Sequence, residues 1–400
     1  MSNPHASAEG KPRPHPNPKT RPKTQGQLLL EITAITGEYP ANNIHRIIPA
    51  RTYAKKVITT LIGDRMLKLV NKGGLKGYRL DYMGKRKLLE ANPDRFCGYL
   101  DGETETNRLR TSISRRMRLH SLAEVCTMMH NAKVEIFQDV KPRVYLPPTP
   151  SAALSQSQGE QLGGITTPYF YTSREQKGQD DNAIRASRAA GTLLTPTHVY
   201  AVYNTGNAES QWRDKVELRY MVEIRDDICR RRFLHQYNGA AVGGIMMGDG
   251  LEVLEGYLQP KAKQQSGLHF LTTTYQPFYF ITNDNHGEAQ LRLLCDDRKM
   301  ASLQNALTAG RLPPDPKYPI EHDALTKDGK PVLFCCLLDI PRLFRFRAGI
   351  ALHGKRGVVI AFDFQIETLK RYLGDDVEFI GLIFDKFVGK FFADESSKGG

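Results

Sequence analysis

Residues 27–89 read QLLLEITAITGEYPANNIHRIIPARTYAKKVITTLIGDRMLKLVNKGGLKGYRLDYMGKRKLL. Apolar residues recur at helical spacing in three parts of this stretch, which predicts three short helices. They are Leu29, Leu30, Ile32 and Ile35, then Ile44, Ile47 and Ile48, and then Tyr53, Val57, Ile58, Leu61 and Ile62. After Asp64 two short apolar runs flank the glycine turn at residues 72–77, which predicts a β-hairpin.

Three helices followed by a basic hairpin form the layout of a winged helix-turn-helix. In that module the third helix enters the major groove of DNA and the hairpin touches phosphates. The predicted contact residues are Arg51, Tyr53, Lys55, Lys56 and Thr59 on the third helix, and Lys68, Lys72, Lys76 and Arg79 on the hairpin. The alternative is a small helical domain whose lysines only form a solvated face.

The distribution of charge supports the DNA-binding prediction. The chain has a formal net charge of +13, with 56 Lys and Arg against 43 Asp and Glu. Residues 1–120 hold 23 of the basic and 10 of the acidic residues, so the remaining 280 residues hold 33 of each. Because the whole excess lies at one end, we expect only that end to meet a polyanion.

Composition bounds the class of protein. At 400 residues and 40% hydrophobic content, the chain can bury a substantial core and is expected to form two domains. Its six cysteines are scattered without metal-ligand spacing, which favours buried thiols in a reducing cytoplasm. No signal peptide opens the sequence and no apolar run reaches the roughly 18 residues of a membrane span, so no membrane partner is expected.

The predicted organisation has five parts. Residues 1–24 are Pro- and Lys/Arg-rich and form a disordered basic arm, and residues 25–95 form the winged helix-turn-helix. Residues 104–140 form an Arg-rich connector helix whose apolar stripe either lies on the first domain or pairs with a second copy of the chain. Its arginines either extend the basic surface or form a solvated face. Residues 141–165 are a Pro-, Ser- and Gln-rich linker, and residues 166–395 form a second domain.

Apolar runs and helical segments alternate along the second domain. Buried strands are predicted at 198–204, 241–248, 277–283, 331–339, 357–364 and 377–385, with helical patterns between them and a short helix at 184–191. This alternation is typical of an α/β fold with a largely parallel sheet.

Three acids are candidates for a catalytic site in this domain. Asp339 and Asp363 stand at the ends of predicted strands, where ligands of α/β sheets collect, and Glu217 begins an approximate Glu-x-Lys nuclease motif with arginine in place of lysine. Converging carboxylates would hold Mg²⁺ or Mn²⁺ for DNA cleavage. The competing interpretation is that Asp339 and Asp363 cap the helices that follow them, in which case no metal or other cofactor is expected.

The residues of the hairpin and the helix after it, LKGYRLDYMGKRKLL, resemble the replication-relaxation family of plasmids and integrative conjugative elements. They are similar to that family's Tyr-x-Leu-Thr-x-x-Gly-x-x-x-Leu pattern, with Asp81 at the usual threonine, and the connector RRMRLHSLAEVCTMM resembles the segment that follows. The resemblance implies a cytoplasmic mobile-element protein with a second domain related to restriction endonucleases. It also implies other proteins of the replication or transfer machinery as partners.

These observations together predict a protein that binds double-stranded DNA and acts in replication, DNA processing or their control. Two alternatives stay open. One is a metal-dependent nicking nuclease with its site in the α/β domain, and the other is a transcriptional regulator whose α/β domain senses a ligand or a partner protein.

Overall fold

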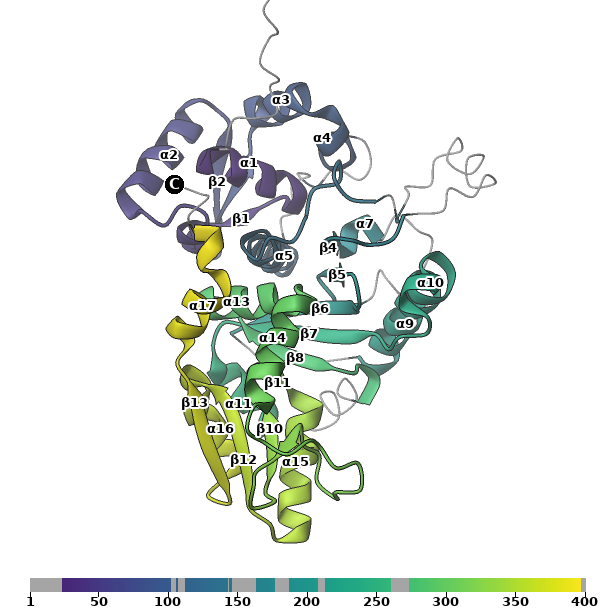
Figure 1. Ribbon diagram of the computed structural model, residues 1–400. Helices are drawn as coiled ribbons and strands as arrows, with labels where there is room; N and C mark the ends of the chain where they lie inside the picture. Colours follow the sequence, from purple (N-terminus) through teal and green to yellow (C-terminus); the bar gives the residue numbers. More distant parts are fainter. Residues whose placement is uncertain are drawn as a thin grey trace, which may run out of the picture.

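We describe a computed structural model of the chain (Figure 1). The structure describes residues 24–101, 106, 112–142, 144–145, 163–176, 187–207, 213–259 and 273–396. The predicted basic arm, apart from Thr24, and most of the predicted linker lie outside the described residues. So do Arg108 and Arg110 of the predicted connector helix.

The N-terminal module contains the predicted helices and hairpin, with one further strand. Thr24 caps the first helix by accepting a hydrogen bond from the Gln27 backbone N–H at 3.2 Å, and Gly37 ends it in the left-handed conformation (φ 86°). The three strands form an antiparallel sheet in the order β1-β3-β2. The elements are α1 (Gln25–Thr36), β1 (Tyr39–Pro40), the 3₁₀ helix η2 (Ala41–Arg46), α2 (Arg51–Gly63), β2 (Leu67–Lys72), β3 (Leu75–Leu80), α3 (Tyr82–Ala91) and α4 (Pro93–Leu100).

The predicted connector helix is α5 (Ile113–Asn131), which ends nine residues before the predicted boundary at 140. Lys133 has a positive φ of 66° in the turn that ends the helix, and Glu135 then pairs with Tyr169 as an isolated β-bridge before a further turn at residues 138–140. Helix α5 lies between α1 and the larger sheet (Figure 1). Its side chains Val125, Met128 and Met129 are fully buried in one cluster with residues of α1 and of the sheet. The helix is therefore part of a continuous core.

The larger sheet has six strands in the order β11-β8-β7-β6-β5-β4. Only its central strands β6, β7 and β8 run parallel, and the strands on both sides are antiparallel. The strands are β4 (Tyr169–Thr172), β5 (Gly191–Leu194), β6 (Val199–Gly206), β7 (Gly243–Gly248), β8 (Phe278–Thr282) and β11 (Leu338–Asp339).

A second sheet has four strands in the order β13-β12-β10-β9, of which β10, β12 and β13 are parallel. They are β9 (Ala324–Leu325), β10 (Pro331–Phe334), β12 (Gly357–Phe362) and β13 (Val377–Leu382). The predicted α/β class is confirmed, and both sheets contain parallel strands, but the domain holds two mixed sheets in place of one largely parallel sheet. The apolar run 331–339, predicted as one strand, breaks after Phe334 and contributes β10 to one sheet and β11 to the other.

Helices cover both faces of the two sheets. The predicted short helix at 184–191 is wrong where the structure describes it: residues 187–190 are extended, because the Ala190 N–H bonds to the Val202 carbonyl (2.7 Å), and Gly191 begins β5. The helices are α7 (Ser173–Gln176), α9 (Asp214–Ile224), the π-helix η3 (Arg225–Arg232), α10 (Leu234–Tyr237), α11 (Leu251–Leu258), α13 (Asn285–Leu294), α14 (Asp297–Thr308), α15 (Ile340–His353), the 3₁₀ helix η4 (Asp363–Gln365), α16 (Ile366–Leu373) and α17 (Phe384–Ser396).

Candidate nucleic-acid interface

Helix α2 presents a polar and basic face to solvent. Ala54, Ile58 and Leu61 are buried against the N-terminal core, and this spacing turns the opposite face outward. The predicted contact residues on this helix are all exposed: Arg51, Tyr53, Lys55, Lys56 and Thr59. No acidic residue occurs in 51–63, so the face has no negative charge of its own.

The β2–β3 hairpin extends the basic surface. Lys68, Lys72 and Lys76 are exposed, as predicted. The turn is made by Gly73 and Gly74, whose positive φ values of 57° and 79° explain why both positions are glycine. Lys68 Nζ lies 3.8 Å from the Asp81 carboxylate, and both groups are partly in water. An ion pair of that kind contributes little and leaves the lysine able to exchange it for a phosphate.

Arg79 does not belong to this surface. Its residue exposure is 1%, so the prediction that it contacts DNA is wrong. Side chains alternate between the two faces of a strand, and in β3 this places Arg79 on the face turned toward the protein.

Arg116 of α5 was expected on an exposed face, either extending the basic surface or simply solvated, and it is buried too. Its guanidinium pairs with Glu38, with Nε–Oε1 and Nη2–Oε1 distances of 3.0 and 2.5 Å. Nη2 also donates to the backbone carbonyls of Val70 (3.0 Å) and Leu75 (3.1 Å), which lie on the two strands of the hairpin. Arg116 therefore fixes the hairpin to α5. Its neighbours Arg115 and Arg118 are exposed.

Glu38 is the centre of this buried cluster. His120 Nε2 lies 2.9 Å from Glu38 Oε1. Burial by itself raises the pKa of Glu38, but the hydrogen bonds and charges of His120 and Arg116 outweigh it and hold the pKa below its usual value. The cluster joins residues 38, 116 and 120, and a sequence offers no local signal for a pairing over that distance.

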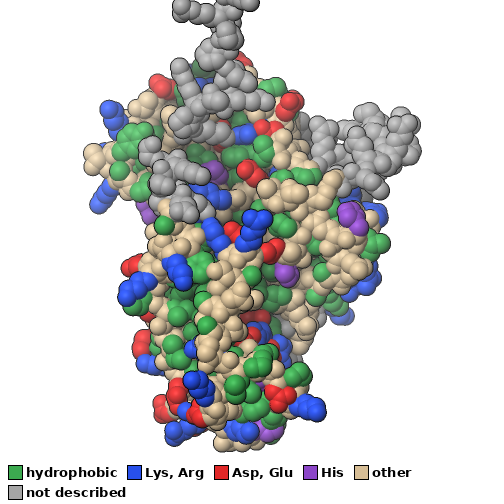
Figure 2. All heavy atoms as spheres, in the orientation of Figure 1, with side chains coloured by type: hydrophobic (Ala, Val, Ile, Leu, Met, Phe, Trp, Pro, Cys, Tyr) green, Lys and Arg blue, Asp and Glu red, His purple; other side chains and the backbone are tan. Residues whose placement is uncertain are grey.

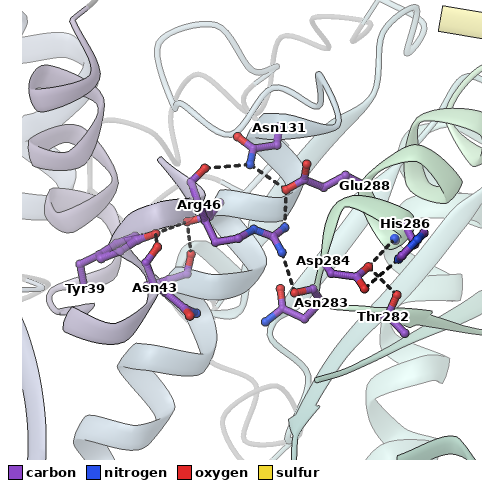
Figure 3. A network of polar contacts seen from close by, with 12 residues as sticks. Tyr39, Asn43, Arg46, Asn131, Thr282, Asn283, Asp284, His286 and Glu288 are labelled. Carbon is purple, nitrogen blue, oxygen red and sulfur yellow. Dashed lines mark hydrogen bonds and ion pairs between the residues drawn. The ribbon is translucent and has the colours of Figure 1, made fainter. Parts of the chain in front are cut away.

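The N-terminal module is held against the carboxyl ends of the parallel strands by Arg46 of η2 (Figure 3). Its guanidinium donates to the Asn283 carbonyl (2.6 Å) and pairs with the Glu288 carboxylate. Asn131 at the end of α5 donates to the same carboxylate at 2.7 Å and to the Arg46 carbonyl at 3.3 Å. The network thus joins η2, α5 and the start of α13. Helix α2, which carries the basic face, follows directly after η2 in the chain.

A second contact of the same junction runs through Glu124 of α5. Asn43 of η2 and Asn204 of β6 donate to its two carboxylate oxygens at 3.0 and 2.9 Å. Burial raises the pKa of Glu124, and nearby Asp249 adds to this effect. The end of the parallel strands, where small ligands bind in many α/β proteins, is here occupied by the protein's own N-terminal module.

The three candidate catalytic acids lie in different surroundings. Glu217 is fully buried on α9, where it accepts hydrogen bonds from Ser187 Oγ (2.7 Å), the Arg188 N–H (3.0 Å) and the Tyr203 hydroxyl (3.0 Å). Asp363 is exposed and accepts from the backbone N–H of Phe384, the first residue of α17, at 3.3 Å. Asp363 thus caps a helix far along the chain as well as beginning η4.

Asp339 occupies the N-cap position of α15, as predicted. The carboxylate accepts from the Phe278 N–H of β8 at 3.4 Å. Burial raises its pKa to about 6, although Arg342 and Arg345 oppose this. It lines a cavity of about 90 Å³ with Asp323, Arg342 and apolar residues of α14. Within the part of the chain that the structure describes, no three His, Cys, Asp or Glu side chains are arranged to hold a metal ion.

The charged surface differs between the two ends of the molecule. Figure 2 shows Lys and Arg side chains projecting from the upper left corner, where Figure 1 draws α2. Over the four-stranded sheet, at the bottom of the same view, acidic and basic side chains are mixed. On this face, part of the N-terminal basic charge is therefore exposed at α2.

Comparison with protein-family models, with curated proteins and with solved structures finds no match to this chain. None of the helices in the described ranges combines the length and the apolar character needed to cross a membrane.

Proposed function

We propose that the chain binds double-stranded DNA through α2 and the β2–β3 hairpin. The observation that carries the proposal is the exposed basic surface of these two elements. It displays Arg51, Lys55, Lys56, Lys68, Lys72 and Lys76, and residues 51–63 and 67–80 contain no acid. The order of elements from α1 to β3 resembles that of a winged helix-turn-helix, and in that module a helix in the place of α2 enters the major groove.

The buried contacts also support this assignment. A hairpin that follows the phosphate backbone must hold its position relative to the helix in the groove, and Arg116 ties both hairpin strands to α5. Arg46 ties the element before α2 to α13. Both arginines stabilise the module, and the exposed Lys55 and Lys56 remain the groups that would meet DNA.

The test removes charge from α2 without touching the core. In the Lys55→Ala/Lys56→Ala variant we expect weaker binding to duplex DNA and a log–log salt slope smaller by about two, one unit for each phosphate that the variant no longer neutralises. The matched control is Lys355→Ala/Arg356→Ala, which removes two exposed charges from the turn before β12. Equal effects of the two variants, or no change in either, would contradict the proposal.

The wider role that we propose is the one implied by the resemblance of residues 75–89 and 115–129: replication or transfer of a mobile element, in the cytoplasm. A nicking assay on supercoiled DNA with Mg²⁺ or Mn²⁺ tests the nuclease alternative. Cleavage that disappears in Asp339→Asn or Glu217→Gln would establish it.

A further inference from the structure

The edge strands of the three sheets differ in how open they are to another chain. Strands β1, β9 and β11 are two residues long. The outer edge of β4 is partly covered, because Tyr169 of this strand forms a β-bridge with Glu135. Strand β2 carries Lys68 and Lys72, which discourage pairing. Short length, cover and lysines are the usual protection of edge strands. Strand β13 is six residues long, VEFIGL, without Lys or Pro, and no other strand of the described residues pairs with its outer edge; its one charged residue is Glu378, which pairs with Lys330.

Strand β13 lies on the outer flank of the molecule (Figure 1). Ile380 is 43% exposed and Ile383, directly after the strand, is 49% exposed. The Asp376 carbonyl accepts a hydrogen bond from the Gly357 N–H of β12. The N–H and C=O groups of the even-numbered residues of β13 therefore point toward β12. Because these groups alternate in direction along a strand, those of Phe379 and Gly381 point away from the sheet.

We infer that β13 is a homodimer interface, in which two copies pair antiparallel about a two-fold axis at Ile380. In this register Ile380 lies opposite Ile380 of the second copy, Phe379 opposite Gly381, and Val377 opposite Ile383. These pairs are apolar, and an aromatic residue covers the glycine, while the remaining pair of the strand sets the exposed Glu378 opposite Leu382. The strand is therefore complementary to itself, which a two-fold interface requires.

Charged residues flank the strand at both ends. Asp375 and Asp376 precede β13, and Asp385 and Lys386 follow it in the first turn of α17; all four are exposed. In this register Asp375 lies opposite Asp385 of the second copy, with Lys386 beside it, so these charges do not select the pairing. A second copy is favoured over an unrelated strand by the apolar matches.

Helix α5, where the sequence predicted that a second copy could pair, offers much less. Its residues Val125, Met128 and Met129 are fully buried within the chain. The second half of the apolar stripe that prompted that prediction is used by the protein's own core, and only Ile113 and Met117 of its first half are exposed, at 42% and 58%. Strand β13 keeps both its backbone edge and its isoleucines exposed.

The first test is the oligomeric state by light scattering after size exclusion. We expect the full chain to have twice the monomer mass of 45.1 kDa. The Ile380→Lys/Ile383→Lys variant should be monomeric with an unchanged melting temperature. The control Leu312→Lys changes a leucine of similar exposure (47%), which bridges to β9 at the opposite edge of this sheet, and should remain dimeric. A monomeric wild type, a dimeric double variant or a monomeric control would each overturn the inference.

The second test fixes the register by cross-linking. Ile380 occupies a non-hydrogen-bonded antiparallel site, where opposing Cα atoms are about 4.5 Å apart, within the range for a disulfide. Ile380→Cys should therefore form a covalent dimer on mild oxidation. Glu378→Cys should not, because in this register the two cysteines are separated by about 13 Å along the strands. Wild type, which has an exposed Cys97, gives the background. Cross-linking of Glu378→Cys but not of Ile380→Cys would contradict the register.

Discussion

Replacing Arg116 with Met tests whether the buried ion pair fixes the hairpin. The side chains of Arg116 and Glu38 are 1% and 0% exposed, so the variant leaves a carboxylate buried without its main partner. It also removes the donor to the Val70 and Leu75 carbonyls. Breaking one side of a buried pair costs about 3–5 kcal/mol of the free energy of unfolding, and we expect a decrease of that size.

Removing both charges should cost less than the sum of the single costs. The Nη1 atom of Arg116 is buried without a hydrogen-bond partner among the residues that the structure describes, so the pair itself is not fully satisfied. We expect Glu38→Gln/Arg116→Met to be less destabilised than the two single variants added together, by about 1–3 kcal/mol. Urea unfolding followed by circular dichroism measures all three variants. Arg115→Met, which changes the exposed neighbour, is the control and should stay within about 0.5 kcal/mol of wild type.

The same cluster predicts a dependence on pH. The pKa of Glu38 is lowered in the folded state, so its contribution to stability is fully present above the unfolded value of 4.5 and disappears as the pH falls through the folded value. Wild type should therefore lose stability on acidification more steeply than Glu38→Gln. The proposed role of the Arg116–Glu38 pair is refuted if Arg116→Met lowers the free energy of unfolding no more than Arg115→Met does. It is also refuted if the free-energy losses of Glu38→Gln and Arg116→Met simply add in the double variant.

Three further variants test other buried groups. Asp339→Asn should stabilise the protein by up to about 3 kcal/mol at pH 7.5, because burial raises the pKa of Asp339 in the folded state to about 6 from 3.8. The gain should vanish near pH 4, where Asp339 of the folded wild type is protonated. Urea unfolding at both pH values measures the difference. Gly77→Ala places a Cβ against Glu38 and should lower the melting temperature, with a cost of about 1–3 kcal/mol. Arg46→Met leaves the Glu288 carboxylate without its ion pair, at a cost of about 3 kcal/mol, and should increase amide hydrogen exchange in η2 before it does so in β7.

Local sequence patterns were sufficient for the elements that depend on local physics. The apolar spacing of Tyr53, Val57, Ile58, Leu61 and Ile62 predicts the helix α2, although its buried face is made by Ala54, Ile58 and Leu61, and the Gly73-Gly74 turn predicts the hairpin. These signals involve residues within one or two turns of each other. The structure adds β1 to the same sheet. This strand consists of Tyr39 and Pro40 alone, and two residues are too few to form a recognisable strand pattern.

The sequence was insufficient where a distant residue decides the outcome. Arg79 and Arg116 look like the exposed arginines beside them, and only the fold brings Glu38 to Arg116. The apolar run 331–339 is uniform, so periodicity gives no sign that it crosses from one sheet to the other after Phe334. Asp339 has the position of a helix cap, but pairing of β11 with β8 buries its carboxylate against the Phe278 N–H.

The shared core has a consequence for the proposed DNA-binding module. One hydrophobic cluster contains Leu29 of α1, Met128 of α5 and Val202 of β6, and α5 contributes to the module and to the sheet at once. Separating the module from the sheet would expose these residues to water, at a cost of roughly 25 cal/mol for each Å² of apolar surface. The cluster therefore fixes the orientation of α2 to the six-stranded sheet. A second cluster, which contains Ala201 of β6 and Val377 of β13, joins that sheet to the four-stranded sheet, so α2 also has a fixed orientation to β13. In a dimer paired through β13, the two α2 helices would stand at a fixed spacing, so the dimer would recognise half-sites at one separation only.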